Sequence, residues 1–160
     1  GEIDLPDSVL ERLDIAIASI HMPCFKDERT IDNVTAAYEK VMEHPYVDII
    51  GHPDDGRFPV DMKRLVKKAK ETGTLLEVNN SSLRPEGFRE NTKENCLEMV
   101  KECKAQGVMI VLGSDSHVDA DIAEYPYAEE ILRETDFPEE LVANVSLEKL
   151  KACIKHGKKL

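Results

Sequence analysis

Short apolar runs alternate along the chain with longer segments in which apolar residues recur at helical spacing. Short continuous apolar runs bounded by polar residues, glycine or proline are typical of buried strands, whereas a 3.6-residue repeat is typical of amphipathic helices. Strands that alternate with helices of this length form βα units with a parallel sheet, so the pattern predicts an α/β fold. The pattern is compatible with a barrel and with an open sheet. The expected strands are 13–20, 46–51, 74–79 and 108–112, and a further short apolar run lies at 141–145.

Capping residues mark where the intervening helices begin and end. Thr30 is a favourable N-cap for a helix that ends before Pro45. Asp61 and Gly73 are the expected boundary residues of the next helix, because aspartate caps helix N-termini and glycine commonly follows their C-termini. The expected helices span 30–44, 61–73, 92–107, 127–134 and 146–157, the last capped by Ser146 and closed by Gly157.

The composition changes this picture mainly through its charge. The 160 residues fit a single domain and carry a formal net charge of −11. An acidic chain disfavours a nucleic-acid partner, because phosphate backbones are bound by lysine and arginine, and it leaves room for bound cations. No apolar run approaches the roughly eighteen residues of a membrane-spanning helix, so no membrane partner is expected. The cysteines lack C-x-x-C spacing and favour a reducing cytoplasm, with Cys96 and Cys103 as small buried apolar residues.

Side chains that can bind metals follow three of the four expected strands. His21 follows the first strand, His52 the second, and Asp115 and His117 the fourth. Because the carboxyl ends of parallel strands lie at one edge of a sheet or barrel, these four side chains are expected to converge. Imidazole and carboxylate groups are common zinc ligands and also suit iron and manganese. The sequence therefore predicts a site for divalent metal ions at this edge.

Two further residues near the strand ends are candidate substrate contacts, and each is open to a second interpretation. Asn79 ends the third strand, where its side chain either binds a substrate oxygen or holds the following loop through hydrogen bonds. Arg57 lies in the loop after His52, where it either clamps a phosphate or is a solvated surface arginine. His44 and His156 lie at expected helix ends, where a cation interacts favourably with the helix dipole, and both are expected to be structural.

Several segments resemble, in order along the chain, the polymerase and histidinol phosphatase (PHP) family, most closely its YcdX-like branch of bacterial phosphatases. The segments are "ASIHMPCF", "IIGHPDD", "LLEVNNSSL", "KENC", "VLGSDSH" and "NVSLEKL". The similarity runs over nearly the whole chain, and "GSDSH" and "EVNNSS" are its most specific parts. The resemblance implies a distorted (β/α)7 barrel, a cluster of up to three metal ions at the carboxyl ends of the strands, and hydrolysis of a small phosphate ester by a metal-activated water.

The resemblance also implies roles for the four residues at the strand ends. Carried over residue by residue, it makes His21 and His52 ligands of one metal ion, Asp115 a ligand of a second and His117 a ligand of a third. Asp115 and His117 would also be the catalytic residues, with Asp115 orienting the attacking water. Zinc is the expected metal, and manganese and iron are alternatives.

The chain departs from the family's pattern at its beginning. The family opens with an H-x-H motif and later carries a metal-bridging glutamate in a G-x-E segment, and neither occurs here. At about thirty residues per βα unit, about three units are absent on the N-terminal side, so residues 1–160 are expected to be the C-terminal part of one PHP domain. We expect the isolated chain to be weak or inactive and to bind metal weakly. It should either self-associate or pack against a missing N-terminal segment. The alternative is a catalytically incompetent PHP-like module for binding or regulation.

Overall fold

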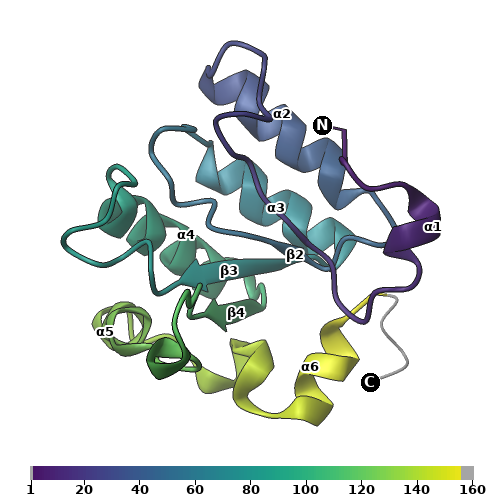
Figure 1. Ribbon diagram of the computed structural model, residues 1–160. Coiled ribbons are helices and arrows are strands. Elements are labelled where there is room, and N and C mark those ends of the chain that lie inside the picture. Colours follow the sequence, from purple (N-terminus) through teal and green to yellow (C-terminus); the bar gives the residue numbers. More distant parts are fainter. Residues whose placement is uncertain (1, 156–160) are drawn as a thin grey trace.

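The computed structural model describes residues 2–155 and has a four-stranded parallel sheet at its centre (Figure 1). The strands are paired in sequence order, β1-β2-β3-β4, and helices connect them. The α/β class expected from the sequence is therefore confirmed. The strand bounds are β1 Ile17–Ala18, β2 Ile49–Ile50, β3 Leu75–Asn79 and β4 Ile110–Gly113.

Local capping chemistry places the helices close to where the sequence predicts them. The Thr30 hydroxyl accepts the Asn33 N–H at 3.2 Å, and the Asp61 carboxylate accepts the Arg64 N–H at 3.1 Å. Gly73 follows the second of these helices with a left-handed φ of 67°, a conformation that glycine adopts without steric cost. Gly157 lies outside the described residues. The helices are α1 Asp7–Leu10, α2 Ile31–Met42, α3 Met62–Thr72, α4 Thr92–Gln106, α5 Pro126–Glu134 and α6 Leu147–Cys153, with 3-10 turns η1 Asp119–Asp121, η2 Glu139–Leu141 and η3 Ala143–Val145.

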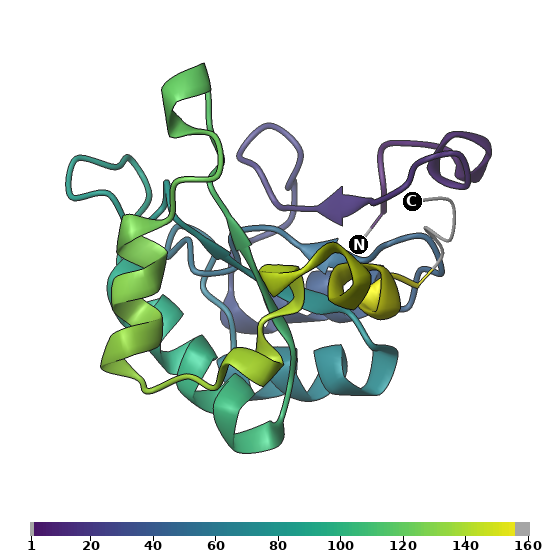
Figure 2. The ribbon, with the colours of Figure 1, turned by 90° about the horizontal axis from the view of Figure 1, so that it is seen from below.

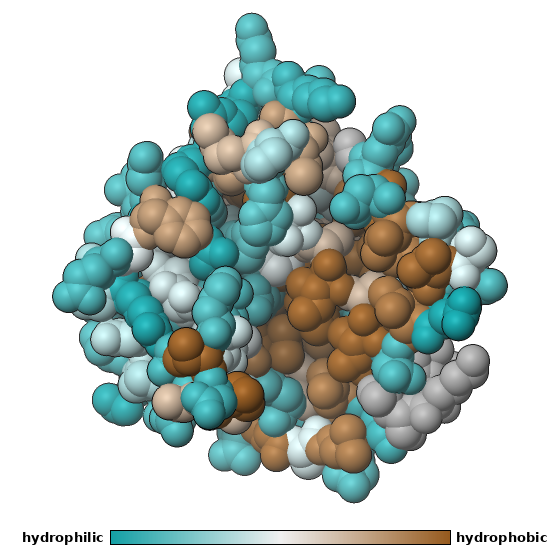
Figure 3. Space-filling model, in the orientation of Figure 1, coloured by the Kyte–Doolittle hydropathy of each residue, from teal (hydrophilic) through white to brown (hydrophobic). Residues whose placement is uncertain are grey.

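The two faces of the sheet are covered unequally. Helices α2, α3 and α4 cover one face, where the larger core cluster lies, and Figure 2 shows them together on that side. The opposite face packs against α6 and η3 through a small cluster of four buried residues. Because side chains alternate along a strand, neighbours such as Ile49 and Ile50 point to opposite faces. In Figure 3 an apolar patch lies over the sheet between α1 and α6.

Two expected strands, 13–20 and 46–51, are much shorter in the structure, and the apolar run 141–145 forms no strand. Of the apolar run 13–20, only Ile17–Ala18 is a strand, and it pairs with β2. The Ala16 N–H is bound by the buried Asp48 carboxylate instead of a strand carbonyl, at 2.9 Å. The run 141–145 forms 3-10 turns. It meets the sheet through one parallel bridge between Ile110 and Val142 and through two hydrogen bonds between the Asn144 side chain and the backbone of Leu112. Over residues 2–155 the sheet is open, and the barrel stays a prediction.

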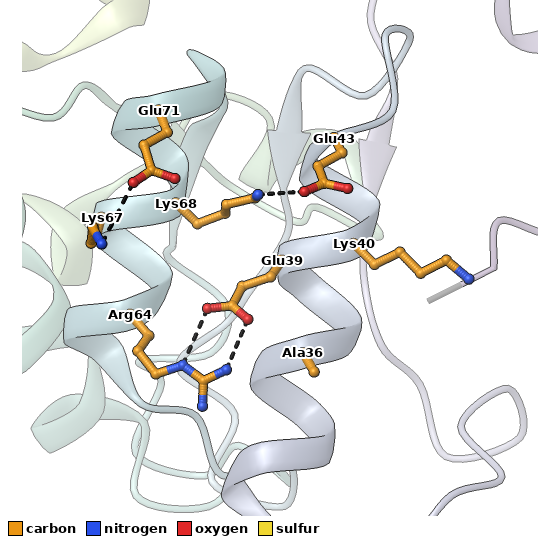
Figure 4. Close-up of a pocket in the computed structure, with 8 residues that line it drawn as sticks. All are labelled: Ala36, Glu39, Lys40, Glu43, Arg64, Lys67, Lys68 and Glu71. Carbon is orange, nitrogen blue, oxygen red and sulfur yellow. Dashed lines mark hydrogen bonds and ion pairs between the residues drawn. The ribbon is translucent and has the colours of Figure 1, made fainter.

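A pocket of about 480 Å³ lies between the outer surfaces of α2 and α3 and is lined mostly by charged side chains (Figure 4). Arg64 donates to both carboxylate oxygens of Glu39 at 3.2 and 2.8 Å, and Lys68 donates to Glu43 at 2.5 Å. In Figure 4 the side chains of these ion pairs point toward one another, so the pairs link α2 to α3. The pocket contains none of the residues that follow the strands. None of the described helices is both long enough and apolar enough to cross a membrane.

Candidate functional site

His21 and His52 lie side by side at the carboxyl ends of β1 and β2. Their ring centroids are 4.9 Å apart, with one ring edge-on to the other. The Ser19 hydroxyl lies 2.9 Å from Nε2 of His21 and holds that ring. His52 is buried, and its Nδ1 atom has no hydrogen-bond partner. Burial and the nearby charges of Arg89 and His21 lower the pKa of His52 to about 4, so the ring is neutral and can bind a metal.

The backbone turns abruptly at two of the expected metal ligands. His52 has a φ of 34° and Asp115 a φ of 48°, both in the left-handed region that residues with a Cβ atom rarely adopt. Such conformations cost about 1–3 kcal/mol each and are concentrated at functional sites. The two side chains lie near enough for the charge of each to affect the pKa of the other.

Glu77 lies at the centre of this region, in the middle of β3. Its carboxylate accepts the backbone N–H of His52 at 2.8 Å and the side-chain amide of Asn79 at 3.2 Å. Burial raises its pKa. Gly113 provides the space, since a Cβ atom there would lie 1.9 Å from Oε1 of Glu77. Sequence reasoning assigned Glu77 no role, although a single acidic residue in the otherwise apolar run "LLEV" was a usable signal.

Arg89, which sequence reasoning also missed, connects the third and fourth strand ends. Its side chain is 7% exposed. Nη2 donates to Asp115 at 3.1 Å, and Nη1 donates to the Ser82 hydroxyl at 2.8 Å and more weakly to the Asn79 side-chain oxygen at 3.4 Å. Burial raises the pKa of Asp115, but the hydrogen bond and charge of Arg89 outweigh it, and the pKa lies below its usual value.

The loop after His52 carries two buried aspartates with different environments. Asp54 is fully buried, neither carboxylate oxygen has a hydrogen-bond partner, and desolvation raises its pKa to about 7. Asp55 is paired with Arg57, which donates from Nε at 2.9 Å and from Nη2 at 2.5 Å. The guanidinium of Arg57 is therefore engaged with Asp55 and is not simply solvated. Its contact with a phosphate stays a prediction.

The fourth expected ligand, His117, makes no ring contact with either histidine of the pair. It is exposed, and its Nδ1 atom lies 3.0 Å from the backbone oxygen of Asp115. His44 lies elsewhere, with Nε2 3.2 Å from a carboxylate oxygen of Asp7, and His156 is outside the described residues.

The chemistry of these side chains fits a divalent metal ion. The imidazole rings of His21 and His52 are adjacent, and Nδ1 of His52 is buried without a hydrogen-bond partner. The number of donors does not complete a site. Within residues 2–155, no three histidine, cysteine, aspartate or glutamate side chains lie close enough together to hold one ion. The described residues therefore place two imidazole groups side by side and contain no complete set of metal ligands.

Comparison with known proteins shows which kind of enzyme this chain resembles. No protein-family model matches the chain. A probable phosphatase of Clostridium novyi (strain NT) is 46% identical over 160 residues, which are the whole of this chain and 64% of that protein. The chain is similar over its whole length to proteins named as probable phosphatases.

Two further relatives support the comparison. A probable phosphatase of Acetivibrio thermocellus is 42% identical over 158 residues, which are 99% of this chain and 64% of that protein. A probable phosphatase of Caldicellulosiruptor saccharolyticus is 39% identical, covering 100% of this chain and 66% of that protein. These names support a phosphatase function. The chain spans just under two thirds of the length of the phosphatases it matches, so the activity of a complete protein is a matter for proposal.

Proposed function

We propose that this chain is part of a metal-dependent phosphoesterase that hydrolyses a small phosphate ester by means of a metal-activated water. The observation that carries the proposal is the contact between the rings of His21 and His52 at the carboxyl ends of the strands, in a chain similar to probable phosphatases. A pair of imidazoles beside a carboxylate and a buried guanidinium provides groups for both a cation and a phosphate.

In this proposal the strand-end residues hold the ions. His21 and His52 bind one divalent ion, Asp115 a second and His117 a third, with zinc as the expected metal and manganese or iron as alternatives. When bound, such ions polarise a phosphoryl oxygen and lower the pKa of water. The remaining ligands would come from the part of the protein that the relatives have and this chain lacks. That part would complete the single domain and close its sheet into a barrel.

The other polar residues would position the substrate. Arg89 is a candidate phosphate contact, since its buried Nε atom has no hydrogen-bond partner. That atom lies 3.8 Å from a carboxylate oxygen of Asp55, and the other two nitrogen atoms donate to Ser82 and Asp115. Arg57 and Asn79 are further candidate contacts on the same edge. Asp115 would orient the attacking water. Glu77 fixes the His52 backbone through the 2.8 Å hydrogen bond and thereby fixes the direction of its ring. The free cysteines suit a cytoplasmic location.

A catalytically incompetent binding or regulatory module is the alternative. The observation in its favour is that the described residues contain no group of three metal donors. A pair of histidines alone binds metals more weakly than the three or four ligands of a zinc enzyme. The two functions make opposite predictions for hydrolysis by the complete protein.

The decisive experiment measures hydrolysis of a generic phosphate ester by the complete natural protein, with and without a chelator. His52→Ala and Asp115→Ala should lower kcat/KM by about a hundredfold or more, because each removes a proposed metal ligand. His44→Ala is the matched control, because this histidine lies outside the site and should leave kcat/KM unchanged. Hydrolysis that survives both the chelator and His52→Ala would overturn metal dependence. Metal binding without hydrolysis would favour the binding module.

A further inference from the structure

The loop between β3 and α4, residues 80–91, forms a pocket of about 280 Å³ beside the candidate site. The lining residues that matter for its chemistry are Ser81, Ser82, Arg84, Phe88 and Arg89. The volume is at the small end of the range for ligand pockets, so it fits a small organic group.

Arg89 belongs to both the pocket and the strand-end site. Its Nη2 donates to Asp115 at 3.1 Å, and its Nη1 donates to the hydroxyl of Ser82, a pocket residue, at 2.8 Å. A phosphate ester whose phosphate lies beside Asp115 would therefore place its alcohol part in or next to this pocket. The pocket is thus in a position to determine which ester is accepted.

The pocket is rich in arginine although the chain carries a net charge of −11. Phe88 is 74% exposed, and the guanidinium carbons of Arg57 and Arg89 lie 4.8 and 5.3 Å from its ring centroid. Cation–π contacts of this kind hold the two guanidinium groups near one ring. Two arginines, Arg84 and Arg89, line the pocket itself, and Glu86 is the one acidic residue that lines it within the described part of the chain.

Arg84 is the arginine that an incoming anion can engage most easily. Arg57 is held by the buried Asp55 and Arg89 by Asp115, whereas Arg84 is 42% exposed and pairs with Asp121 at 2.7 Å. Exposed ion pairs of this kind contribute little, so a ligand anion can replace Asp121. Two serine hydroxyls and the guanidinium group supply hydrogen-bond donors that match carboxylate or phosphate oxygens.

We propose that this pocket selects phosphate esters whose alcohol part carries a second anionic group, either a carboxylate or a second phosphate, and that Arg84 binds that group. This proposal rests on the proposed phosphoesterase function, because the first phosphate is taken to lie at the strand ends. It adds the class of substrate, which the proposed function leaves open.

The test compares matched pairs of substrates with the complete natural protein. 3-Phosphoglycerate against glycerol 3-phosphate tests a second carboxylate, and fructose 1,6-bisphosphate against fructose 6-phosphate tests a second phosphate. The doubly anionic member of at least one pair should have a kcat/KM about tenfold higher or more. Arg84→Gln should abolish that preference through a higher KM with little change in kcat. Asp121→Asn, which frees Arg84, should lower the KM, and Arg12→Gln is the control at an exposed arginine elsewhere.

Equal kcat/KM values within both pairs, or a preference that survives Arg84→Gln, would overturn the proposal even if hydrolysis is observed. If no ester is hydrolysed, the proposed function fails, and calorimetric binding of the same compounds tests the pocket separately. Tighter binding of a doubly anionic compound that is lost in Arg84→Gln would then support an anion pocket. Equal binding of both members of each pair would refute it.

Discussion

The contact between Glu77 and Gly113 can be tested by adding a single methyl group. A Cβ atom at position 113 would lie 1.9 Å from Oε1, 2.8 Å from Cδ and 3.1 Å from Cγ of Glu77. All three of its nearest neighbours belong to that one side chain. Glu77 is buried between strand ends and cannot swing into solvent without giving up its hydrogen bonds to the His52 N–H and the Asn79 amide. Gly113→Ala should therefore displace the Glu77 carboxylate.

The size of the effect follows from these contacts. Overpacking a buried site typically costs about 1–3 kcal/mol, and leaving a buried N–H donor unpaired costs a similar amount. Because Glu77 can relax partly, we expect Gly113→Ala to lower the free energy of unfolding by about 2 kcal/mol. In a Glu77→Ala background the obstructing atoms are gone, and the same change should cost only about 0.5 kcal/mol. The coupling of about 1.5 kcal/mol is within the range of residues in direct contact.

Urea unfolding followed by far-UV circular dichroism measures these quantities, since the chain has no tryptophan to serve as a fluorescent probe. Gly56→Ala is the matched control. A Cβ atom there would meet the Glu90 backbone oxygen at 2.5 Å and Asn91 at 3.2 Å, so its cost should not be relieved by Glu77→Ala. An equal cost of Gly113→Ala with and without the Glu77 side chain would refute the placement of this carboxylate.

Other predictions concern the helix ends, the thiols and the metal. Asp61→Ala should lower the free energy of unfolding by about 1 kcal/mol, because it removes an N-cap. Gly73→Ala should cost about as much through backbone strain alone, since an added Cβ atom meets nothing within 4 Å. With Ellman's reagent, exposed Cys24 should react in the folded protein. Cys96 and Cys103 should react only after unfolding, since burial raises both pKa values, that of Cys103 to about 12. After dialysis the isolated chain should retain less than one metal equivalent, and more than one would contradict an incomplete site.

The sequence predicted those features of the fold that depend on local chemistry. The caps at Thr30 and Asp61 were predictable because a short polar side chain binds an N–H group three residues ahead. The length of a strand depends instead on the partner with which it pairs. The run 13–20 is apolar enough for a long strand, yet β1 pairs only at Ile17 and Ala18, opposite the equally short β2. This pairing brings together residues more than thirty positions apart, so the sequence has no local signal for it.

The candidate site likewise contains residues whose positions the sequence predicts and residues whose positions depend on the tertiary structure. The positions of His21, His52 and Asp115 at the strand ends follow from the alternation of strands and helices, which the sequence displays. Arg89 could not be placed, because it lies in an irregular loop ten residues after β3 and reaches Asp115 only when that loop folds back. A contact between residues 26 positions apart is a property of the tertiary structure and has no local signal.

The face of the sheet that packs against α6 is covered by few residues, and this favours association of the isolated chain. Ile17 is in register with Ile49, and Ile49 with Leu75, so the three side chains share the face that packs against α6. Ile49 and Leu75 are buried, but Ile17 is 58% exposed and lies in β1, an edge strand of the sheet over residues 2–155. Exposed apolar surface next to an open sheet edge favours association. We therefore propose that the isolated chain self-associates through this face, and that the additional part of a complete protein would cover it instead.

Light scattering after size exclusion tests this prediction on the 160-residue chain over a range of concentrations. The chain should be larger than a monomer, and Ile17→Glu should shift it toward the monomer because a carboxylate would be buried in the interface. Ile31→Glu is the matched control, because this isoleucine is 52% exposed at the start of α2, a helix on the opposite face of the sheet. A wild-type chain that is monomeric at every concentration would show that the exposed face does not drive association. The α6 contacts would then suffice to keep this side of the sheet stable in water.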